Sequence, residues 1–185
     1  MKTIIIGLGN PGEQYKNTRH NVGFMAIDKF AEINNFPDFN LQKKANALVA
    51  ENENIILAKP QTFMNESGKA VRQITKPYTL NPKPLLVVVH DDIDLPVGKI
   101  KVVQERGSAG HKGVESIIQN IGNDGLIRIR IGIGGAKDVE AMDIVLKKFS
   151  ETEQKVMDEV IEKTAEAIKC LIDNGLEKTM NEYNG

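Results

Sequence analysis

The chain has 185 residues, of which 41% are hydrophobic and 26% charged, and its net charge is −1 at pH 7. That length suits one buried core, so we expect a single domain over residues 1–185, and the near-neutral charge excludes a chain that is basic throughout. No apolar run nears the ~20 residues of a membrane span, and a single cysteine, Cys170, fits a reducing compartment, so we expect a cytoplasmic protein with no membrane partner.

Strand and helix patterns alternate along the chain. Runs of β-branched residues bounded by turn residues predict strands at 3–8, 47–51, 55–59, 85–90, 100–104 and 127–133. Apolar residues at helical spacing predict helices at 22–33, 66–75, 114–121 and from 150 to about 173. Ser150 and Glu153 predict a capping box at the start of the last helix. The last strand alternates Ile with Arg or Gly, which predicts one basic face.

This order of elements predicts an α/β fold, namely a three-layer α/β/α sandwich with a twisted mixed, largely parallel central sheet. In such sheets, functional sites form beyond the carboxyl ends of the strands. The loops after residues 8, 59 and 90 are therefore the places where we expect a site.

The segment after the first strand holds the most informative polar residues. Gly7, Gly9 and Gly12 form the pattern G-x-G-x-x-G, which binds a dinucleotide when a helix begins inside it and an acid follows a second strand. Residues 12–18 are polar and turn-like instead, which argues against that interpretation. A tight structural turn explains the glycines but not the polar side chains beside them, Asn10, Tyr15 and His20.

His20 stands just before an apolar helix and becomes a candidate base only if an acid orients it. The run His90-Asp91-Asp92-Ile93-Asp94 ends a predicted central strand, so a carboxylate there would face the same crevice. A carboxylate that accepts from one imidazole nitrogen fixes the tautomer and makes the other nitrogen more basic. Asp91 lies at the strand's edge, whereas Asp92 and Asp94 are equally well explained as turn-forming residues of a solvated loop.

Other chemistries compete for these residues. The same acids, together with the histidines, would suit a carboxylate–histidine metal site, although no HExxH or H-x-H spacing is present. A serine hydrolase is poorly supported, because neither Ser67 nor Ser108 lies in G-x-S-x-G. Cys170 lies among apolar helical residues, where core packing explains it.

Two loops and a set of basic residues are candidates for ligand binding. Phe63 and Met64 beside Asn65 give an apolar wall with one amide, although packing against the next helix explains them equally well. The glycine-rich loop 107–113 precedes a helix, so its amides and Lys112 could face an anion. Basic residues on adjoining segments predict a local patch, with scattered surface charge as the alternative. They are Lys99, Lys101, Arg106, Lys112, Arg128 and Arg130.

Several motifs, taken in this order, resemble those of bacterial peptidyl-tRNA hydrolase. They are GLGNPG at 7–12, TRHN at 18–21, TFMNESG at 62–68, HDDIDLP at 90–96, GSAGH at 107–111, RIRIGIG at 128–134 and MNEYNG at 180–185. The resemblance implies a monomeric esterase that needs no metal or cofactor and cleaves the peptide from tRNA after interrupted translation. A non-catalytic member of the fold that binds RNA or protein is the alternative function.

The resemblance also implies residue roles. His20 would be the general base for water, held by Asp91, and Asn10 would help to distinguish a blocked, peptide-like amine. Residues implied in substrate or tRNA binding are Tyr15, Phe63, Met64, Asn65, His111, Arg130 and Lys101.

Two positions depart from the family pattern. Lys112 stands where the family has Asn, in a loop with one glycine fewer, and Val103 stands where a basic residue is common. The role of that Asn is therefore not carried over. Either Lys112 meets a tRNA phosphate or a peptide carbonyl, or the loop is reshaped.

Overall fold

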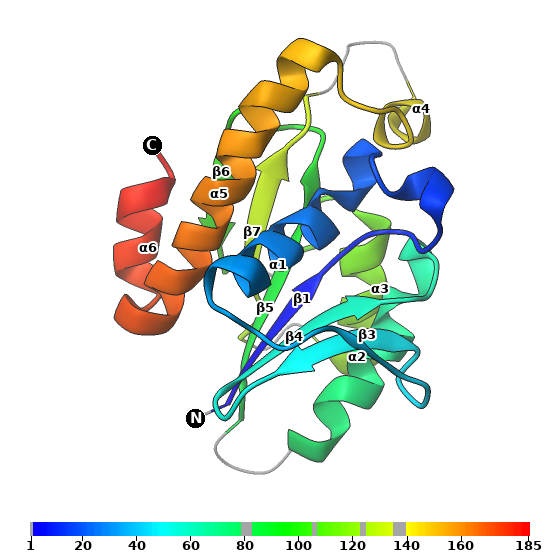
Figure 1. Ribbon diagram of the computed structural model, residues 1–185, viewed down its shortest axis with the longest axis vertical. Helices are drawn as coiled ribbons and strands as arrows, with labels where there is room; N and C mark the ends of the chain where they lie inside the picture. The colour runs from blue at the N-terminus through cyan, green and yellow to red at the C-terminus, as the bar shows by residue number, and fades with distance from the viewer. Residues whose placement is uncertain (1, 79–82, 105–106, 123–124, 135–139) are drawn as a thin grey trace.

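The computed structural model describes residues 2–78, 83–104, 107–122, 125–134 and 140–185. A seven-stranded sheet runs through the described part in the order β2-β3-β4-β1-β5-β7-β6 (Figure 1). The strands are β1 (Thr3–Gly7), β2 (Asn40–Gln42), β3 (Ala47–Glu51), β4 (Ile55–Pro60), β5 (Leu85–Asp92), β6 (Ile100–Val103) and β7 (Ile127–Gly132).

The neighbouring strands β4, β1, β5 and β7 are parallel, and β2, β3 and β6 pair antiparallel at the two sides. Parallel strands are covered on both faces, so they consist of nearly continuous apolar residues. Ile4, Ile5 and Ile6 of β1 are accordingly all fully buried. The predicted mixed sheet with a parallel centre is confirmed.

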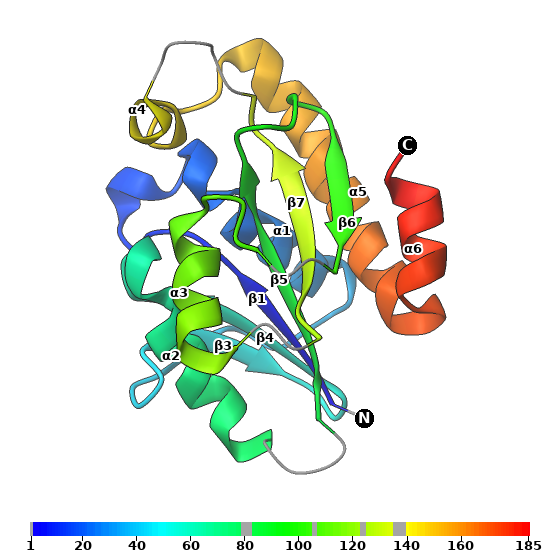
Figure 2. The same ribbon diagram turned by 180° about the vertical axis from the view of Figure 1, so that it is seen from behind.

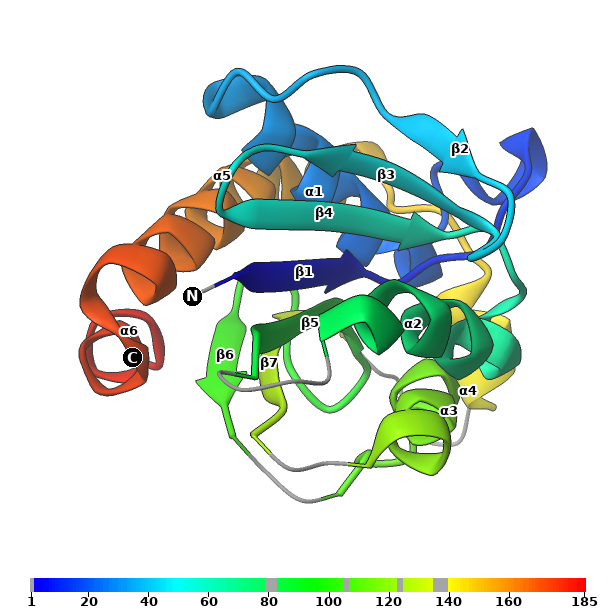
Figure 3. The ribbon, with the colours of Figure 1, turned by 90° about the horizontal axis from the view of Figure 1, so that it is seen from below.

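Helices cover both faces of this sheet, as seen from below in Figure 3. On one face lie α1 (Val22–Ile33) and α5 (Glu151–Asn174), and on the other α2 (Ser67–Thr75) and α3 (Lys112–Ile121), which Figure 2 shows in front. The shorter helices are α4 (Ala141–Val145), α6 (Leu176–Tyr183) and the 3-10 turns η1 (Glu13–Tyr15), η2 (Arg19–Asn21), η3 (Met64–Glu66) and η4 (Lys76–Tyr78). None of the described helices has the length and apolar character needed to cross a membrane.

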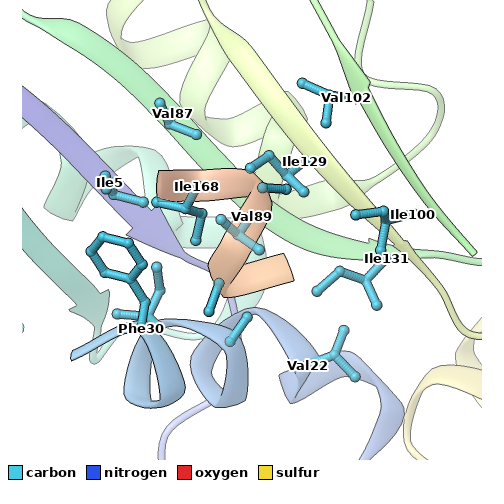
Figure 4. Close-up of a cluster of buried hydrophobic side chains, with 14 of the residues drawn as sticks. Ile5, Val22, Phe30, Val87, Val89, Ile100, Val102, Ile129, Ile131 and Ile168 are labelled. Atoms are coloured by element: carbon cyan, nitrogen blue, oxygen red, sulfur yellow. The ribbon is translucent and has the colours of Figure 1, made fainter. Parts of the chain in front are cut away.

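Two hydrophobic clusters fill the space between the layers. On the α1/α5 face, Ile5, Phe30, Val89 and Ile168 belong to one cluster (Figure 4). Because side chains alternate along a strand, Ile4 and Ile6 point the other way, into the cluster under α2 and α3. The sheet is thereby fixed from both sides, and the carboxyl ends of its strands become a rigid platform.

A close approach between glycines seats α1 on the end of β1. A Cβ atom on Gly7 would lie 2.5 Å from the carbonyl oxygen of Gly23 and from a side-chain carbon of Ile27. A Cβ on Gly23 would meet the backbone of Leu8 at 2.5 Å. The first glycine of G-x-G-x-x-G thus serves helix packing, and this contact fixes where η2, just before α1, can lie.

The α6 side of the sheet ends in a side-chain cap. α6 packs beside the edge strand β6 (Figure 2). The Asn184 side chain accepts from the Val102 N–H at 2.7 Å and donates to the Val102 carbonyl at 2.9 Å. One amide side chain therefore occupies the hydrogen bonds that a further strand would make.

Most expected elements are found within a few residues of their predicted bounds, and the capping box of Ser150 and Glu153 is confirmed. The strand at 127–133 was predicted to have a basic face. That face is not exposed to solvent, because Arg128 is fully buried and Arg130 is 9% exposed. Arg128 reaches the Ser108 carbonyl in the loop before α3, and Arg130 is paired with Asp92. The short elements β2, α4 and α6 had no counterpart in the predicted set.

Candidate active site

A cavity of about 710 Å³ opens at the carboxyl ends of β1, β4 and β5. The loops after these strands line it, together with the loop before α3 and with α4, which lies beside the loop after β1 in Figures 1 and 2. Predicted site residues among the lining are Asn10, Tyr15, His20, Phe63, Met64, Asn65, Asp91, His111 and Lys112. Lys101 and Arg130 are not among the lining residues.

His20 and Asp91 form a hydrogen bond at the floor of the cavity. The distance from His20 Nδ1 to Asp91 Oδ1 is 2.8 Å, and Asp91 is 2% exposed. Because the ionised carboxylate can only accept, Nδ1 carries the proton and Nε2 is left with a free lone pair. This arrangement leaves Nε2 of His20 able to accept a hydrogen bond or a proton from a group in the cavity.

His111 shares the same carboxylate oxygen. Its Nε2 lies 2.8 Å from Asp91 Oδ1, and its Nδ1 accepts from the Val114 N–H at 3.3 Å as the N-cap of α3. Both contacts require the neutral tautomer with the proton on Nε2. His111 was expected to bind substrate, but its two nitrogens are engaged by Asp91 and by α3.

The two histidines determine the charge of Asp91. Burial alone raises the pKa of this carboxyl, but His111 and His20 outweigh burial and hold the pKa well below its usual range. Asp91 is therefore a carboxylate at any pH near neutrality, fixed by two N–H donors on one oxygen.

His90 lies behind this pair and is 1% exposed. Its Nδ1 donates to the Asp91 carbonyl at 2.7 Å, and its ring centroid lies 4.5 Å from that of His111. Burial, and next the neighbouring His111, lower its pKa well below the ordinary histidine value. His90 is a neutral packing residue under the site, with its buried Nε2 unpaired among the described residues.

Asn10 is held from three directions. Its backbone N–H donates to Asn21 Oδ1 and its carbonyl accepts from Asn21 Nδ2, both at 2.9 Å. Its side-chain Oδ1 accepts from the Met64 N–H at 2.8 Å. Because the Met64 N–H needs an acceptor, this contact fixes which end of the Asn10 amide is the oxygen. The other end, Nδ2, has no hydrogen-bond partner among the described residues. The Asn10 amide is an oriented donor at the cavity wall. Asn21, quoted above only as part of the TRHN motif, fixes the backbone of Asn10, and the sequence did not predict this contact.

The basic residues on β6 and β7 differ from the expected patch. Arg130 forms a buried ion pair with Asp92, and Lys101, its register partner on β6, is exposed. The side chain of Asp92 also accepts from the Asp94 N–H at 2.9 Å, as expected of a turn-forming residue. Asp92 is buried, however, and does not lie in a solvated loop. Arg106 lies outside the described residues.

The rim of the cavity is apolar and exposed. Phe63, Met142 and Leu146 are 58%, 57% and 42% exposed. Lys112 is exposed at the first turn of α3, and it makes no ion pair or hydrogen bond with the described residues. In the loop before it, Ala109 has φ of 50°, a conformation that glycine adopts more easily. The missing family glycine is thus replaced by a residue in a left-handed conformation.

A metal ion would find its ligands at the floor. His20, Asp91 and His111 place one ligand atom each within 4.8 Å of one another. One nitrogen of each imidazole already donates to Asp91, so an ion bound at these two nitrogens would have to displace two protons and two hydrogen bonds. The donor set fits a transition metal, whereas the hydrogen bonding fits a histidine base.

Known proteins are similar over nearly the whole chain. A model of the protein family described as Peptidyl-tRNA hydrolase matches residues 4–185. The peptidyl-tRNA hydrolase of Fusobacterium nucleatum is 46% identical over 156 residues, covering 82% of this chain and 80% of that protein. That of Metamycoplasma arthritidis is 40% identical over 182 residues, which are 98% of each chain. The crystal structure of peptidyl-tRNA hydrolase from Acinetobacter baumannii has a TM-score of 0.88 at 32% identity, covering 98% of this chain and 93% of that one.

Proposed function

Because the chain belongs to the peptidyl-tRNA hydrolase family, we propose that His20, held by Asp91, is the general base with which it hydrolyses the ester between peptide and tRNA. The observation that carries this assignment is the 2.8 Å hydrogen bond from His20 Nδ1 to a carboxylate with two N–H donors. It leaves Nε2 as the proton acceptor at the floor of the cavity.

In this mechanism Nε2 of His20 takes a proton from a water molecule while the oxygen of that water attacks the ester carbonyl carbon. The tetrahedral intermediate then collapses, the bond to the ribose oxygen breaks, and the imidazolium returns its proton to that oxygen. Asp91 stabilises the imidazolium and stays ionised throughout. An ester has a better leaving group than an amide, so one base and oriented amide donors suffice.

Asn10 gives the reaction its preference for a blocked amine. Its oriented Nδ2 would donate to the carbonyl oxygen of an N-acyl group, which a free aminoacyl end lacks. A free ammonium group at the same place would meet a donor rather than an acceptor, which is an unfavourable contact. Asn10 thus acts on the substrate without taking part in proton transfer.

The rim would bind the two ends of the substrate. Phe63 and Met64 offer apolar surface to peptide side chains, and Tyr15 and Asn65 offer polar contacts beside it. We assign Lys112 to a tRNA phosphate, because its exposed cation makes no contact with a described carboxylate.

Lys101, exposed on β6, would add positive charge on the tRNA side outside the cavity, whereas the charge of its register partner Arg130 is balanced by Asp92. As the family resemblance implies, we propose a monomer built as one domain over residues 1–185. We also propose that it acts in the cytoplasm, where its substrate arises.

A turnover assay that compares an N-acetylated with a free aminoacyl-tRNA tests the proposal. The wild type should release tRNA from the blocked substrate much faster, and His20→Ala should lose at least about a hundredfold in rate. Asn10→Ala should lose much of the preference for the blocked substrate. Full activity in His20→Ala would refute the proposal that His20 is the general base. RNA binding without turnover by the wild type would favour the non-catalytic alternative.

A further inference from the structure

We infer that Arg19 is a positioning residue whose guanidinium fixes η2, and with it His20, to the ends of β7 and α5. This inference rests on the proposed role of His20 as the base. Arg19 does not line the cavity, so its effect on the reaction must pass through its neighbour in the chain.

The side chain of Arg19 joins three elements. Its Nη1 donates to the Ile133 carbonyl at 2.7 Å, and its Nη2 lies 3.0 and 2.8 Å from the two carboxylate oxygens of Glu153. The guanidinium carbon lies 4.8 Å from the centroid of the Phe149 ring. The side chains of Arg19 and Glu153 are 14% and 31% exposed, so the pair is partly shielded from solvent. Lysine cannot make all of these contacts at once.

The backbone repeats the same connection. The Arg19 N–H donates to the Lys147 carbonyl at 2.9 Å, and Thr18 forms an isolated antiparallel bridge with Lys148. Residues 147–148 lie between α4 and α5. The η2 segment is therefore tied to the chain that leaves the cavity wall as well as to the helix that follows.

Glu153 serves two purposes at once. Its Oε2 accepts from the Ser150 N–H at 2.8 Å and from Ser150 Oγ at 2.9 Å, which closes the capping box of α5. The same carboxylate receives Arg19. The Ser150 N–H, and to a smaller extent Arg19, lower the pKa of Glu153 against the opposing effect of burial. The first turn of the 24-residue helix α5 thus carries the group that anchors η2.

These contacts form a closed circuit around the catalytic hydrogen bond. Arg19 holds the Ile133 carbonyl, and the Ile133 N–H donates to the Asp92 carbonyl at 3.0 Å. Asp92 follows Asp91, which accepts from His20, the residue after Arg19. Without Arg19, the η2 segment that carries His20 loses its hydrogen bond to the Ile133 carbonyl, whereas Asp91 stays in place because His111 still donates to it.

The test compares Arg19→Gln and Glu153→Gln with a matched control. Glu162→Gln makes the same chemical change on α5, and it removes an exposed ion pair to Lys29 of α1 at 3.6 Å. We expect the first two variants to lower kcat by about 10- to 100-fold with KM changed less than about threefold, because a misplaced base costs rate rather than binding. Glu162→Gln should keep both constants.

A spectroscopic readout separates positioning from general stability. The His20 Nδ1–H in its hydrogen bond to Asp91 should give a downfield proton resonance in the wild type and in Glu162→Gln. That resonance should broaden or disappear in Arg19→Gln, measured on protein that is folded by circular dichroism. Arg19→Lys, which retains one contact, should be intermediate. If Arg19→Gln fails to fold, Glu153→Gln decides the question by the same two measurements.

A folded Arg19→Gln or Glu153→Gln protein with wild-type kcat and an unchanged resonance would overturn the inference. The proposed function fails by a different result, namely an active His20→Ala. In that event the resonance would still report whether Arg19 holds His20 against Asp91.

Discussion

The floor and the rim of the cavity differ in how their side chains are held. At the floor, His20, Asp91 and His111 are nearly buried, and the two histidines both donate to one carboxylate oxygen of Asp91. At the rim, Phe63 and Lys112 are exposed and make no polar side-chain contact with the described residues. The floor is organised before substrate arrives, as catalysis of one fixed bond requires. The rim has no such fixed arrangement of polar side chains.

The largest effect is expected from breaking the floor. Asp91→Asn replaces an acceptor of two N–H groups by an amide, so His20 loses the partner that fixes its tautomer. We expect kcat to fall about 10³- to 10⁴-fold, measured in single turnover on an N-acetylated aminoacyl-tRNA. Asp38→Asn, the same change at an exposed position away from the cavity, is the control. A loss below tenfold would mean that the floor needs no carboxylate.

A change at the rim should instead weaken binding. Phe63→Ala removes an apolar ring that the substrate would cover, so we expect KM to rise about tenfold with kcat nearly unchanged. Leu41→Ala removes an exposed apolar side chain on β2 and should change neither constant. A large fall in kcat at constant KM would show that rim and floor are not separate in function.

His90 provides a test of the floor through stability. Its folded-state pKa is lowered by burial, so the unfolded chain takes up a proton below pH ~6.5 that the folded chain does not. Its contribution to stability is complete above that pH and is lost as the pH falls toward the folded-state pKa, by roughly 1 kcal/mol for each unit. His90→Asn, which keeps a donor for the Asp91 carbonyl, should show a shallower loss of urea stability between pH 7.5 and 5.5. Equal slopes would contradict a buried neutral His90.

Lys112 tests the electrostatic part of the rim. Lys112→Gln keeps a hydrogen-bond donor but removes the charge, so the slope of log affinity against log salt should fall by about one if it meets a phosphate. Lys155→Gln, at an exposed position on α5, is the control. An unchanged slope with weaker binding would assign Lys112 to a peptide carbonyl.

The smallest effect is expected from a chelator selective for transition metals. One nitrogen of each histidine at the floor already donates to Asp91, so removal of trace zinc should leave the turnover rate unchanged. Loss of activity that zinc restores would turn the floor into a metal site and end its description as a histidine base.

Local patterns predicted the fold well because the residues that build it act locally. Val22–Ile33 shows helical periodicity, and Ser150 and Glu153 form their capping box within one turn. The prediction of a basic surface on β7 was wrong, because an alternating pattern indicates that a strand has two different faces but not which face is exposed to solvent. Only tertiary contacts, to the Ser108 carbonyl and to Asp92, account for the burial of Arg128 and Arg130.

The site was predictable in its members and less so in its connections. His20 and Asp91 were paired by a resemblance and by their places after neighbouring strands. The second donor to Asp91, His111, lies on a loop whose course depends on tertiary contacts, so nothing local indicated it. α4 has five residues, too few for a helical period to emerge, and its place in the cavity wall was invisible in the sequence.

The Asn184 cap on Val102 has a consequence for self-association. An open strand edge invites another chain to continue the sheet, which leads to domain swapping or fibrous aggregates. At β6 one amide already fills both hydrogen bonds of Val102, and α6 packs beside it. The opposite edge is β2, whose three residues are too few to template a long ladder. The capped Val102 on one edge and the short β2 on the other thus leave few free backbone groups with which another chain could extend this sheet.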